Sequence, residues 1–346
     1  MLPSLYSGIS GLRANQQKLN IIGNNIANSS TTGFKTQSMN FQDMISQNLS
    51  DPSAPSNSIG GVNGKQSGLG VKIGGISTDF TTGSMETTNR NLDFAIDGTG
   101  YFVVGTGALG TDSTTTGVGI DTSDNILNGS GATAPTDTVT PYYTRDGAFS
   151  LDEYGNLVTA DGHRVMGYQV TDGTNAATIT YNKSSQNTIA FADGSGTVTA
   201  VTGQLVPLSI PDSVTKSTGE VKVKTFSVGS DGYITAQLAD GTTAALGQIA
   251  MVSFQNESGL LKQGSNLYTA SSNSGQPIVR TGKGDTTIAD NSGGYGDMSQ
   301  GMLEMSNVDL AQQFTDMIIA SRAFQANGKI ITTDDDILQD LINLKR

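Results

Sequence analysis

The side chains that most often carry out chemistry in proteins are scarce in this chain. Its 346 residues include no cysteine and one histidine, His163. The absence of cysteine excludes disulfides, thiolate metal sites and thiol nucleophiles. A single histidine cannot build the usual zinc site or serve as the base of a Cys-His pair. The sequence therefore predicts no metal site of these kinds.

Two short motifs imitate ligand sites without completing them. Residues 105–110 match the GxGxxG pattern of dinucleotide-binding loops, but that fingerprint requires a helix to follow, and residues 111–119 are β-branched residues and glycine. Asp121, Ser123 and Asn125 imitate the first positions of a calcium loop. The glycine of the sharp turn and the bidentate glutamate are missing from that loop. Both segments are better explained as turns.

The carboxylates offer two further candidates. Asp146 and Asp152 are a possible acid pair, but paired catalytic acids need environments that separate their pKa values, and the sequence indicates none. The run of Asp334, Asp335 and Asp336 favours a helix N-terminus, with a cation site as the alternative. We therefore expect no enzyme and no cofactor, and an interaction or assembly protein instead.

Composition narrows the possible partners. Acidic residues outnumber basic ones by 31 to 19, which gives a formal charge of −12 and makes nucleic acid an unfavourable partner. No apolar stretch reaches the roughly 18 residues of a membrane-spanning helix, so we expect no membrane insertion. The 44 glycines, the absence of tryptophan and a hydrophobic content of 35% favour β-rich modules joined by many turns.

The elements at the two ends carry the most regular pattern. Apolar residues recur there every seven positions, as Leu5, Leu12, Leu19 and Ile26 at the start and as Leu303, Leu310, Met317, Phe324, Ile331 and Leu338 at the end. Ile9 and Phe314 belong to a second column, which gives the spacing of a coiled-coil seam. We expect two terminal helices that pair through this seam. The alternative is a helical hairpin that closes a monomeric domain.

The region between the helices predicts strands and turns. Residues 34–70 are expected to form a linker, because the sequence from about Asn48 to Gly70 is rich in Ser, Asn, Pro and Gly. Asp-Gly pairs, which favour tight turns, occur at 97, 146, 161, 172, 193, 231 and 240. We expect an α+β, discontinuous multidomain chain. Its predicted parts are a helical domain of 1–33 and 303–346, a β-rich middle of 71–173 and 221–302, and a small β insert or outer domain of 174–220.

Several motifs resemble one protein family. The segment from Gly23 to Lys35, which contains Asn24, Asn25, Asn28, Gly33 and Phe34, resembles the N-terminal signature of the bacterial flagellar rod and hook proteins. The stretch 306–327 is similar to the closing helix of that family. Internal matches lie at 92–102, 143–149 and 264–268, so the resemblance spans the chain apart from the linker and two inserts, 105–140 and 174–220.

The resemblance implies a structural role. In this family the terminal helices form the innermost layer of a helical homopolymer, and the β-rich middle forms outer domains. The implied partners are other copies of the chain, the distal rod and hook-filament junction proteins, the hook cap and the flagellar type III export apparatus. The implied location is the extracellular hook and basal body, reached by export without a cleaved signal peptide. Residues 41–45, with Phe41 and Ile45, are similar to the export motif of hook-type substrates. The alternative for that segment is an apolar patch that packs the linker.

Two branches of the family are possible. The segments 68–73 and 79–81 are most similar to the hook branch, whose curved tube transmits torque from rod to filament. The long linker resembles the loop of the distal rod branch instead. The inserts make the chain larger than a typical rod subunit, so the resemblance favours the hook branch, with the distal rod as the alternative.

Overall fold

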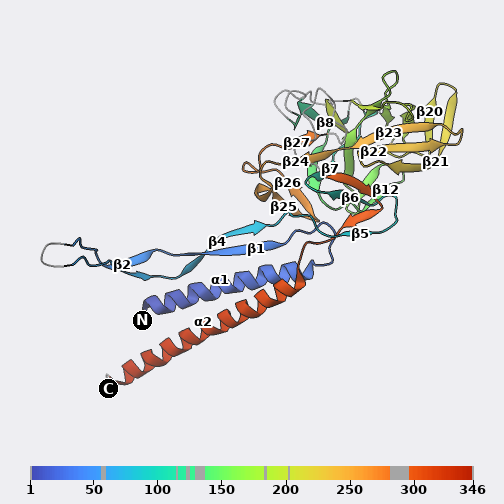
Figure 1. The fold of residues 1–346 in the computed structure, drawn as a ribbon. Helices are drawn as coiled ribbons and strands as arrows, with labels where there is room; N and C mark the ends of the chain where they lie inside the picture. Colours follow the sequence, from blue (N-terminus) through green and yellow to red (C-terminus); the bar gives the residue numbers. More distant parts are fainter. Residues whose placement is uncertain are drawn as a thin grey trace. The chain divides into compact units, whose positions relative to one another are not determined.

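The computed structural model describes residues 2–55, 60–113, 116–121, 125–128, 137–182, 185–201, 203–280 and 296–344. The chain divides into two compact units, which are described separately. Unit 1 consists of residues 1–29, 35–79 and 308–346, and unit 2 of residues 30–34 and 80–307. Figure 1 shows the two terminal helices in unit 1 and the β-rich body in unit 2.

Unit 1 holds both helices, α1 (Leu2–Ala27) and α2 (Leu310–Leu344). α1 ends where Asn28 turns back, with its side-chain amide donating to the Asn24 carbonyl at 2.9 Å. α2 begins after Asp309, whose Oδ1 accepts hydrogen bonds from the backbone N–H groups of Ala311 and Gln312 at 2.9 and 3.2 Å. That arrangement is an N-cap. The aspartate run at 334–336 does not interrupt the helix.

The second helix begins seven residues later than the heptad series predicts. Leu303 lies on strand β29 (Met302–Glu304), which pairs antiparallel with β5 (Met85–Thr87) and sets Leu303 opposite Glu86. The backbone of 302–304 therefore makes sheet hydrogen bonds and is not available for a helix. The helical series starts at Leu310, and Leu303 belongs to unit 2.

The segment predicted as a linker forms a two-stranded ribbon in unit 1. β1 (Gln37–Asp43) pairs antiparallel with β4 (Val71–Thr78), and β2 (Ser46–Ser50) pairs with β3 (Lys65–Gly68). An isolated bridge from Ser53 to Val62 continues the pairing. In Figure 1 the strands β1 and β4 run beside α1. The polar composition of residues 34–70 hid β1, β2 and β3, whose side chains are mostly exposed. β4 belongs to the segment predicted as part of the β-rich middle domain, and the structure places it in unit 1 instead, because it pairs with β1.

Unit 2 is built from short strands, most of them antiparallel. Its first half contains β5, β6 (Phe94–Asp97), β7 (Tyr101–Thr106), β8 (Thr116–Asp121), β9 (Ile126–Leu127), β10 (Asp137–Thr138), β11 (Thr140–Thr144), β12 (Phe149–Leu151), β13 (Leu157–Thr159), β14 (Arg164–Tyr168), β15 (Val170–Thr171), β16 (Ile179–Thr180), β17 (Thr188–Ala190), β18 (Thr199–Ala200) and β19 (Gln204–Pro207).

Its second half contains β20 (Ser213–Lys216), β21 (Gly219–Val228), β22 (Tyr233–Leu238), β23 (Thr243–Ile249), β24 (Met251–Ser253), a 3-10 turn (Glu257–Gly259), β25 (Leu261–Gly264), β26 (Leu267–Thr269), β27 (Ile278–Arg280), β28 (Asp297–Gln300) and β29.

Strand β7 runs through the centre of unit 2. It pairs with β11, β14 and β24, and its first five residues are buried. The predicted insert 174–220 contributes Ile179, Ile189 and Leu208 to the same hydrophobic cluster as Phe94 and Phe149. Residues 174–220 are therefore packed into unit 2 and do not form a core of their own.

Candidate assembly interface

The two helices of unit 1 lie antiparallel with a regular register. Ser4 Oγ donates to Asp334 Oδ2 at 2.8 Å near one end, and Asn25 Nδ2 donates to Gln313 Oε1 at 3.0 Å near the other. Between these contacts, small residues let the backbones approach. A Cβ added at Gly11 would lie 2.8 Å from the amide nitrogen of Asn327. Gly8 and Gly11 of α1 therefore face α2 directly.

The predicted seam residues of α1 and α2 are not enclosed in the single chain. Leu5, Leu12, Leu19 and Ile26 of α1, and Met317, Phe324, Ile331 and Leu338 of α2, are half-buried. Ile9, Leu310 and Phe314 are exposed, at 38%, 42% and 49%. The side chains of α1 that are fully buried are smaller or on another face, such as Ala14, Ile21 and Ile22. The heptad residues thus keep a substantial surface in water.

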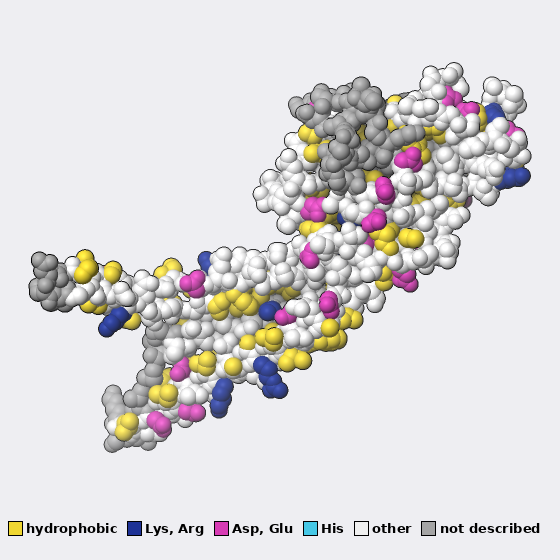
Figure 2. All heavy atoms as spheres, viewed as in Figure 1, with side chains coloured by type: hydrophobic (Ala, Val, Ile, Leu, Met, Phe, Trp, Pro, Cys, Tyr) yellow, Lys and Arg dark blue, Asp and Glu magenta, His cyan; other side chains and the backbone are white. Residues whose placement is uncertain are grey.

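α2 also carries a second apolar stripe that the sequence analysis missed. We call it the outer stripe: Ile319, Ile330, Ile337 and Leu344, all exposed, with fractions of 57%, 45%, 44% and 83%. Steps of eleven and seven residues place them on one face of the helix. Part of the signal was present in the sequence, because Ile330, Ile337 and Leu344 recur every seven positions. Figure 2 shows yellow hydrophobic side chains exposed along the helices.

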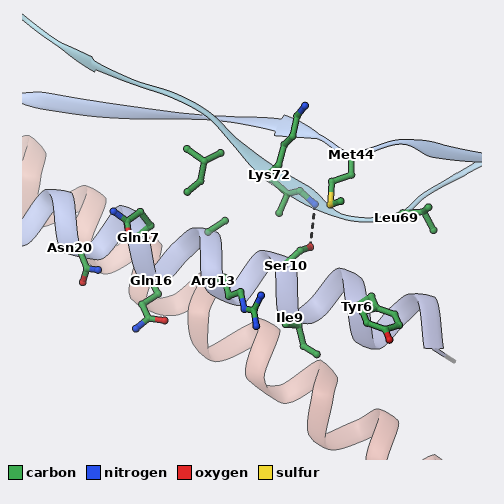
Figure 3. Close-up of a pocket in the computed structure, with 13 residues that line it drawn as sticks. Tyr6, Ile9, Ser10, Arg13, Gln16, Gln17, Asn20, Met44, Leu69 and Lys72 are labelled. Atoms are coloured by element: carbon green, nitrogen blue, oxygen red, sulfur yellow. Dashed lines mark hydrogen bonds between the residues drawn. The ribbon is translucent and has the colours of Figure 1, made fainter. Parts of the chain in front are cut away.

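A groove lies between α1 and the ribbon. It has a volume of about 950 Å³ and is lined by Tyr6, Ile9, Ser10, Arg13, Ala14, Gln16, Gln17, Asn20, Met44, Leu69, Val71, Lys72 and Ile73. In Figure 3 the Ser10 hydroxyl points at the strand, where its oxygen accepts a hydrogen bond from the Val71 N–H at 3.2 Å. Gly70 is required there because an added Cβ would lie 2.4 Å from Ser10 Oγ. One end of the groove is therefore fixed by a specific contact.

Most of the ribbon is exposed to solvent. Every described residue from Asn40 to Gly68 is solvent-exposed, including Phe41, Met44 and Ile45, and Ile45 is 81% exposed. A two-stranded ribbon of this kind is marginally stable in water. Phe41 and Ile45, the candidate export residues, are accessible on this ribbon in the single chain.

The asparagine-rich signature ties the elements of unit 1 together. Asn25 is 1% exposed. Its Nδ2 donates to the Gln37 carbonyl at 2.8 Å as well as to Gln313, and its Oδ1 accepts the Gln37 N–H at 3.1 Å. One side chain thus connects α1, β1 and α2. Asn24 is exposed, and its carbonyl accepts the capping bond from Asn28.

The glycine and phenylalanine of the signature lie in unit 2 around a buried ion pair. Gly33 has φ 65°, and its N–H donates to the Glu304 carbonyl at 2.8 Å. Phe34 is buried beneath the amine of Lys262, which lies 4.3 Å from the ring centroid. Arg145 Nη1 lies 3.2 Å from Glu304 Oε2, and both side chains are 1% exposed.

Hydrogen bonds complete this ion pair. Arg145 Nη1 and Nη2 donate to the carbonyls of Ile96 and Gly98 at 3.3 and 2.6 Å, and Glu304 Oε1 accepts the Gly83 N–H at 2.9 Å. The guanidinium also stacks 5.4 Å from the Tyr101 ring centroid. The cluster fastens the start of unit 2 to its end. The cluster has a structural role, because both charged groups are bound by partners within unit 2.

The residues considered for chemistry are used by turns and packing. Asp152 Oδ1 accepts the N–H groups of Tyr154 and Asn156, and Asp146 Oδ1 accepts the Thr32 hydroxyl. His163 packs edge-on against Tyr142. Ser123 of the calcium-like segment lies outside the described residues. Within the part of the chain that the structure describes, no group of three acidic or histidine side chains could hold a metal ion.

Neither described helix combines the length and apolarity needed to span a bilayer.

Comparison with known families identifies three matching regions. Residues 5–35 match the model "Flagella basal body rod protein", residues 127–236 match "Flagellar hook protein FlgE/F/G D1 domain", and residues 299–344 match "Flagellar basal body rod FlgEFG protein C-terminal". These regions include both terminal helices and the strands around β14 and β19.

Curated relatives match along the whole chain. The flagellar basal-body rod protein FlgG of Bacillus subtilis (strain 168) is 41% identical over 346 positions, covering 100% of both chains. The flagellar hook protein FlgE of Borreliella burgdorferi is 29% identical over 449 positions, covering 100% of both. The hook protein FlgE of Salmonella typhimurium is 27% identical over 457 positions, covering 99% of this chain and 100% of its own. The relatives are named for structural parts of the flagellum.

Proposed function

Because the chain belongs to the family of flagellar basal-body rod and hook proteins, we propose that it is a polymerising structural subunit of the flagellar axis and, within it, of the distal rod. The proposal of a polymer rests on the heptad residues of α1 and α2, which are half-buried or exposed in the single chain. Burying such apolar surface is the main driving force for association. Neighbouring copies would supply the missing contacts.

The alignments support the rod branch over the hook branch that the sequence motifs favoured. The alignment with the rod protein is 346 positions long, which equals the length of this chain. The rod protein therefore contains no segment that this chain lacks. The match to the hook protein of Borreliella burgdorferi extends over 449 positions, so that protein contains segments that this chain lacks. Identity is also higher to the rod protein, at 41% against 29%.

The ribbon is a second support for the rod branch. Residues 37–78 form a long, exposed, two-stranded extension in place of a compact linker. A long loop at this position is the feature of the sequence that resembles the distal rod branch. In a straight, rigid tube such an extension would add fixed contacts between subunits.

The partners follow from the same proposal. Other copies of the chain are the primary partner, and adjoining axial proteins complete the ends of the polymer. Export would proceed through the flagellar type III apparatus, and Phe41 and Ile45 are accessible for recognition by it. The extracellular basal body would be the site of assembly.

Electron microscopy of concentrated protein tests the proposal. A distal rod subunit is expected to form straight tubes. Curved tubes would overturn the rod assignment and favour the hook. Particles that stay monomeric at every concentration, salt and pH would contradict the polymer as a whole.

The hook is the second candidate because hook proteins match this chain from end to end at 27–30% identity. In that case the hook cap and the hook-filament junction proteins would be the adjoining partners.

A further inference from the structure

We propose that the groove between α1 and the ribbon receives the outer stripe of α2 from a second copy of the chain. This inference rests on the proposed polymeric function and deepens it, since it names the two surfaces that meet. The outer stripe is Ile319, Ile330, Ile337 and Leu344. The groove is lined by apolar side chains such as Ile9, Met44, Leu69 and Ile73 together with two cations, Arg13 and Lys72.

α2 carries apolar side chains on two faces. Ile331 lies on the face toward α1, since a Cβ added at Gly8 would lie 3.4 Å from its Cγ1. The outer stripe lies mostly on another face: Ile330 also reaches Gly8, at 3.8 Å from such a Cβ, but all four residues of the stripe are exposed in the single chain. A helix with two apolar stripes is complete only when a second partner covers the second stripe. The partner must itself present an apolar concave surface, which the groove does.

The charges of the two helices also favour this contact. α1 contains Arg13 and Lys18 and no carboxylate. α2 contains five aspartates, at 316, 334, 335, 336 and 340, against Arg322 and Lys329. The two surfaces are therefore of opposite sign, and the fit of acidic helix to basic groove would set register as well as attraction.

The aspartates at 334, 335, 336 and 340 do not reach Arg13 within one chain. Ser4 lies against Asp334 and Asn25 against Gln313, so the antiparallel register places Asp336 beside the first residues of α1. Arg13 is then roughly 16 Å away along the helix axis, at about 1.5 Å per residue. That separation exceeds the screening length of about 10 Å in 0.1 M salt.

No ion pair among the described residues joins Arg13, Lys18 or Lys72 to the aspartates of α2. A second copy displaced along the axis brings the aspartates of its α2 to the cations of the groove. A second copy is therefore the occupant that satisfies the apolar stripe and the charges together.

Cross-linking tests the proposal cleanly because the chain has no cysteine of its own. Two single variants, Ile9→Cys in the groove and Ile337→Cys on the outer stripe, are mixed, polymerised and treated with a short bis-maleimide reagent. A cross-link between unlike chains can only be intermolecular. We expect it to form several-fold more in polymer than in unpolymerised protein. Gln339→Cys, two residues along the same helix and exposed on another side, is the matched control and should give little product with Ile9→Cys.

Three outcomes separate the proposals. Polymers that form but give no more product with Ile337→Cys than with Gln339→Cys overturn the groove assignment and leave the polymeric function intact. Unmodified chain that never polymerises overturns both. Efficient polymerisation with the expected cross-link supports both.

A charge exchange keeps the proposal falsifiable if a cysteine variant assembles poorly. Asp336→Lys with Asp340→Lys should slow polymerisation, and so should Arg13→Glu with Lys72→Glu. The chain carrying all four substitutions should recover, because opposite signs again face each other. An unchanged rate in the first two variants, or no recovery in the third, would contradict the proposal.

Discussion

Arg145 is the largest of the fully buried side chains of unit 2, and it is charged. Breaking a buried ion pair by removing one partner is strongly destabilising, since the remaining charge has no solvent and no counterion. We expect Glu304→Gln to lower the free energy of unfolding of unit 2 by about 3–5 kcal/mol. Thermal unfolding followed by near-ultraviolet circular dichroism measures the effect.

The pair Lys216–Asp240 is the matched control for this prediction. Its N–O distance is 2.6 Å, but the pair lies at the surface, where solvent screens it. Asp240→Asn should leave the melting temperature nearly unchanged. A loss as large as that of Glu304→Gln would show that charge neutralisation itself, rather than burial, destabilises the fold.

The carboxyl of Asp146 should give the stability of the fold a pH dependence opposite in sense to that from most surface acids. Burial raises the pKa of its carboxyl above the ordinary value, and the charges of Asp93 and Asp161 add to the rise, against hydrogen bonds from Ala148 and Thr32. The folded chain therefore binds this proton more tightly than the unfolded chain does. Its contribution to stability is present below the unfolded pKa of about 3.9 and is lost as pH rises through the folded pKa.

Asp146→Asn tests this sign directly. An asparagine keeps the oxygen that accepts from Thr32 and Ala148 and removes the poorly solvated charge. We expect the variant to melt at a higher temperature than the parent at pH 7 and at the same temperature near pH 3. Equal destabilisation at both pH values would mean that hydrogen-bond geometry, and not desolvation, governs this position.

At the scale of elements, the sequence predicted the features that depend on local residue patterns. The first helix, the β-rich middle and the Asp-Gly turns follow from local residue preferences. At Gly162 and Gly232 the positive φ values of 82° and 79° are those that the turns require. Glycine is needed at position 147 for another reason, because an added Cβ would lie 1.7 Å from the Phe94 carbonyl oxygen. Such a contact between distant segments leaves no local signal.

The element boundaries that were missed have the same explanation. Leu303 fits the heptad series, but its backbone pairs with strand β5, which lies more than two hundred residues earlier in the chain. Residues 40–68 of the ribbon are largely polar, which fits the exposure of every described residue among them in a single chain. Three residues of the outer stripe, Ile330, Ile337 and Leu344, have heptad spacing in the sequence, but their exposure depends on which face of α2 meets α1. Only the tertiary contacts decide that.

The seam of the terminal helices gives a prediction at this scale. Leu12 and Leu19 are half-buried, and each would be enclosed by a neighbour in a polymer. Leu12→Asp with Leu19→Asp places charge in that contact, at a cost of roughly several kcal/mol for each unpaired buried ion. We expect polymer formation, measured by sedimentation, to be lost while the far-ultraviolet β signal of unit 2 is kept.

Gln325→Asp with Gln339→Asp is the control for the seam. Both positions are exposed on α2 and lie off the two apolar stripes. That variant adds the same charge and should polymerise normally. Normal assembly by the leucine variant would refute the role of the seam.

At the scale of the whole molecule, the two units differ in how they are stabilised. Unit 2 has large hydrophobic clusters and a buried ion pair within one chain. Among the described residues of unit 1, fully buried apolar side chains are few, and Ala320 is the one on α2. A helix gains most of its stability in proteins by packing its apolar face, so unit 1 should depend on neighbours for order. Assembly and folding of this unit would then be coupled.

Limited digestion with trypsin tests that coupling. In unpolymerised protein we expect early cleavage at Arg13, Lys18, Arg322 and Lys329, all on the two helices, and a resistant fragment that contains unit 2. Cleavage of a transiently opened segment follows the population of the open form, so unstable helices are cut first. Polymerisation should slow cutting at these four sites more than at Lys222 and Lys224 of β21, which are exposed in unit 2. Mass spectrometry of the fragments over time measures both rates. Helices that resist trypsin as well as unit 2 does before polymerisation would show that unit 1 is already stable alone, and the heptad surface would then need another explanation than folding on a neighbour.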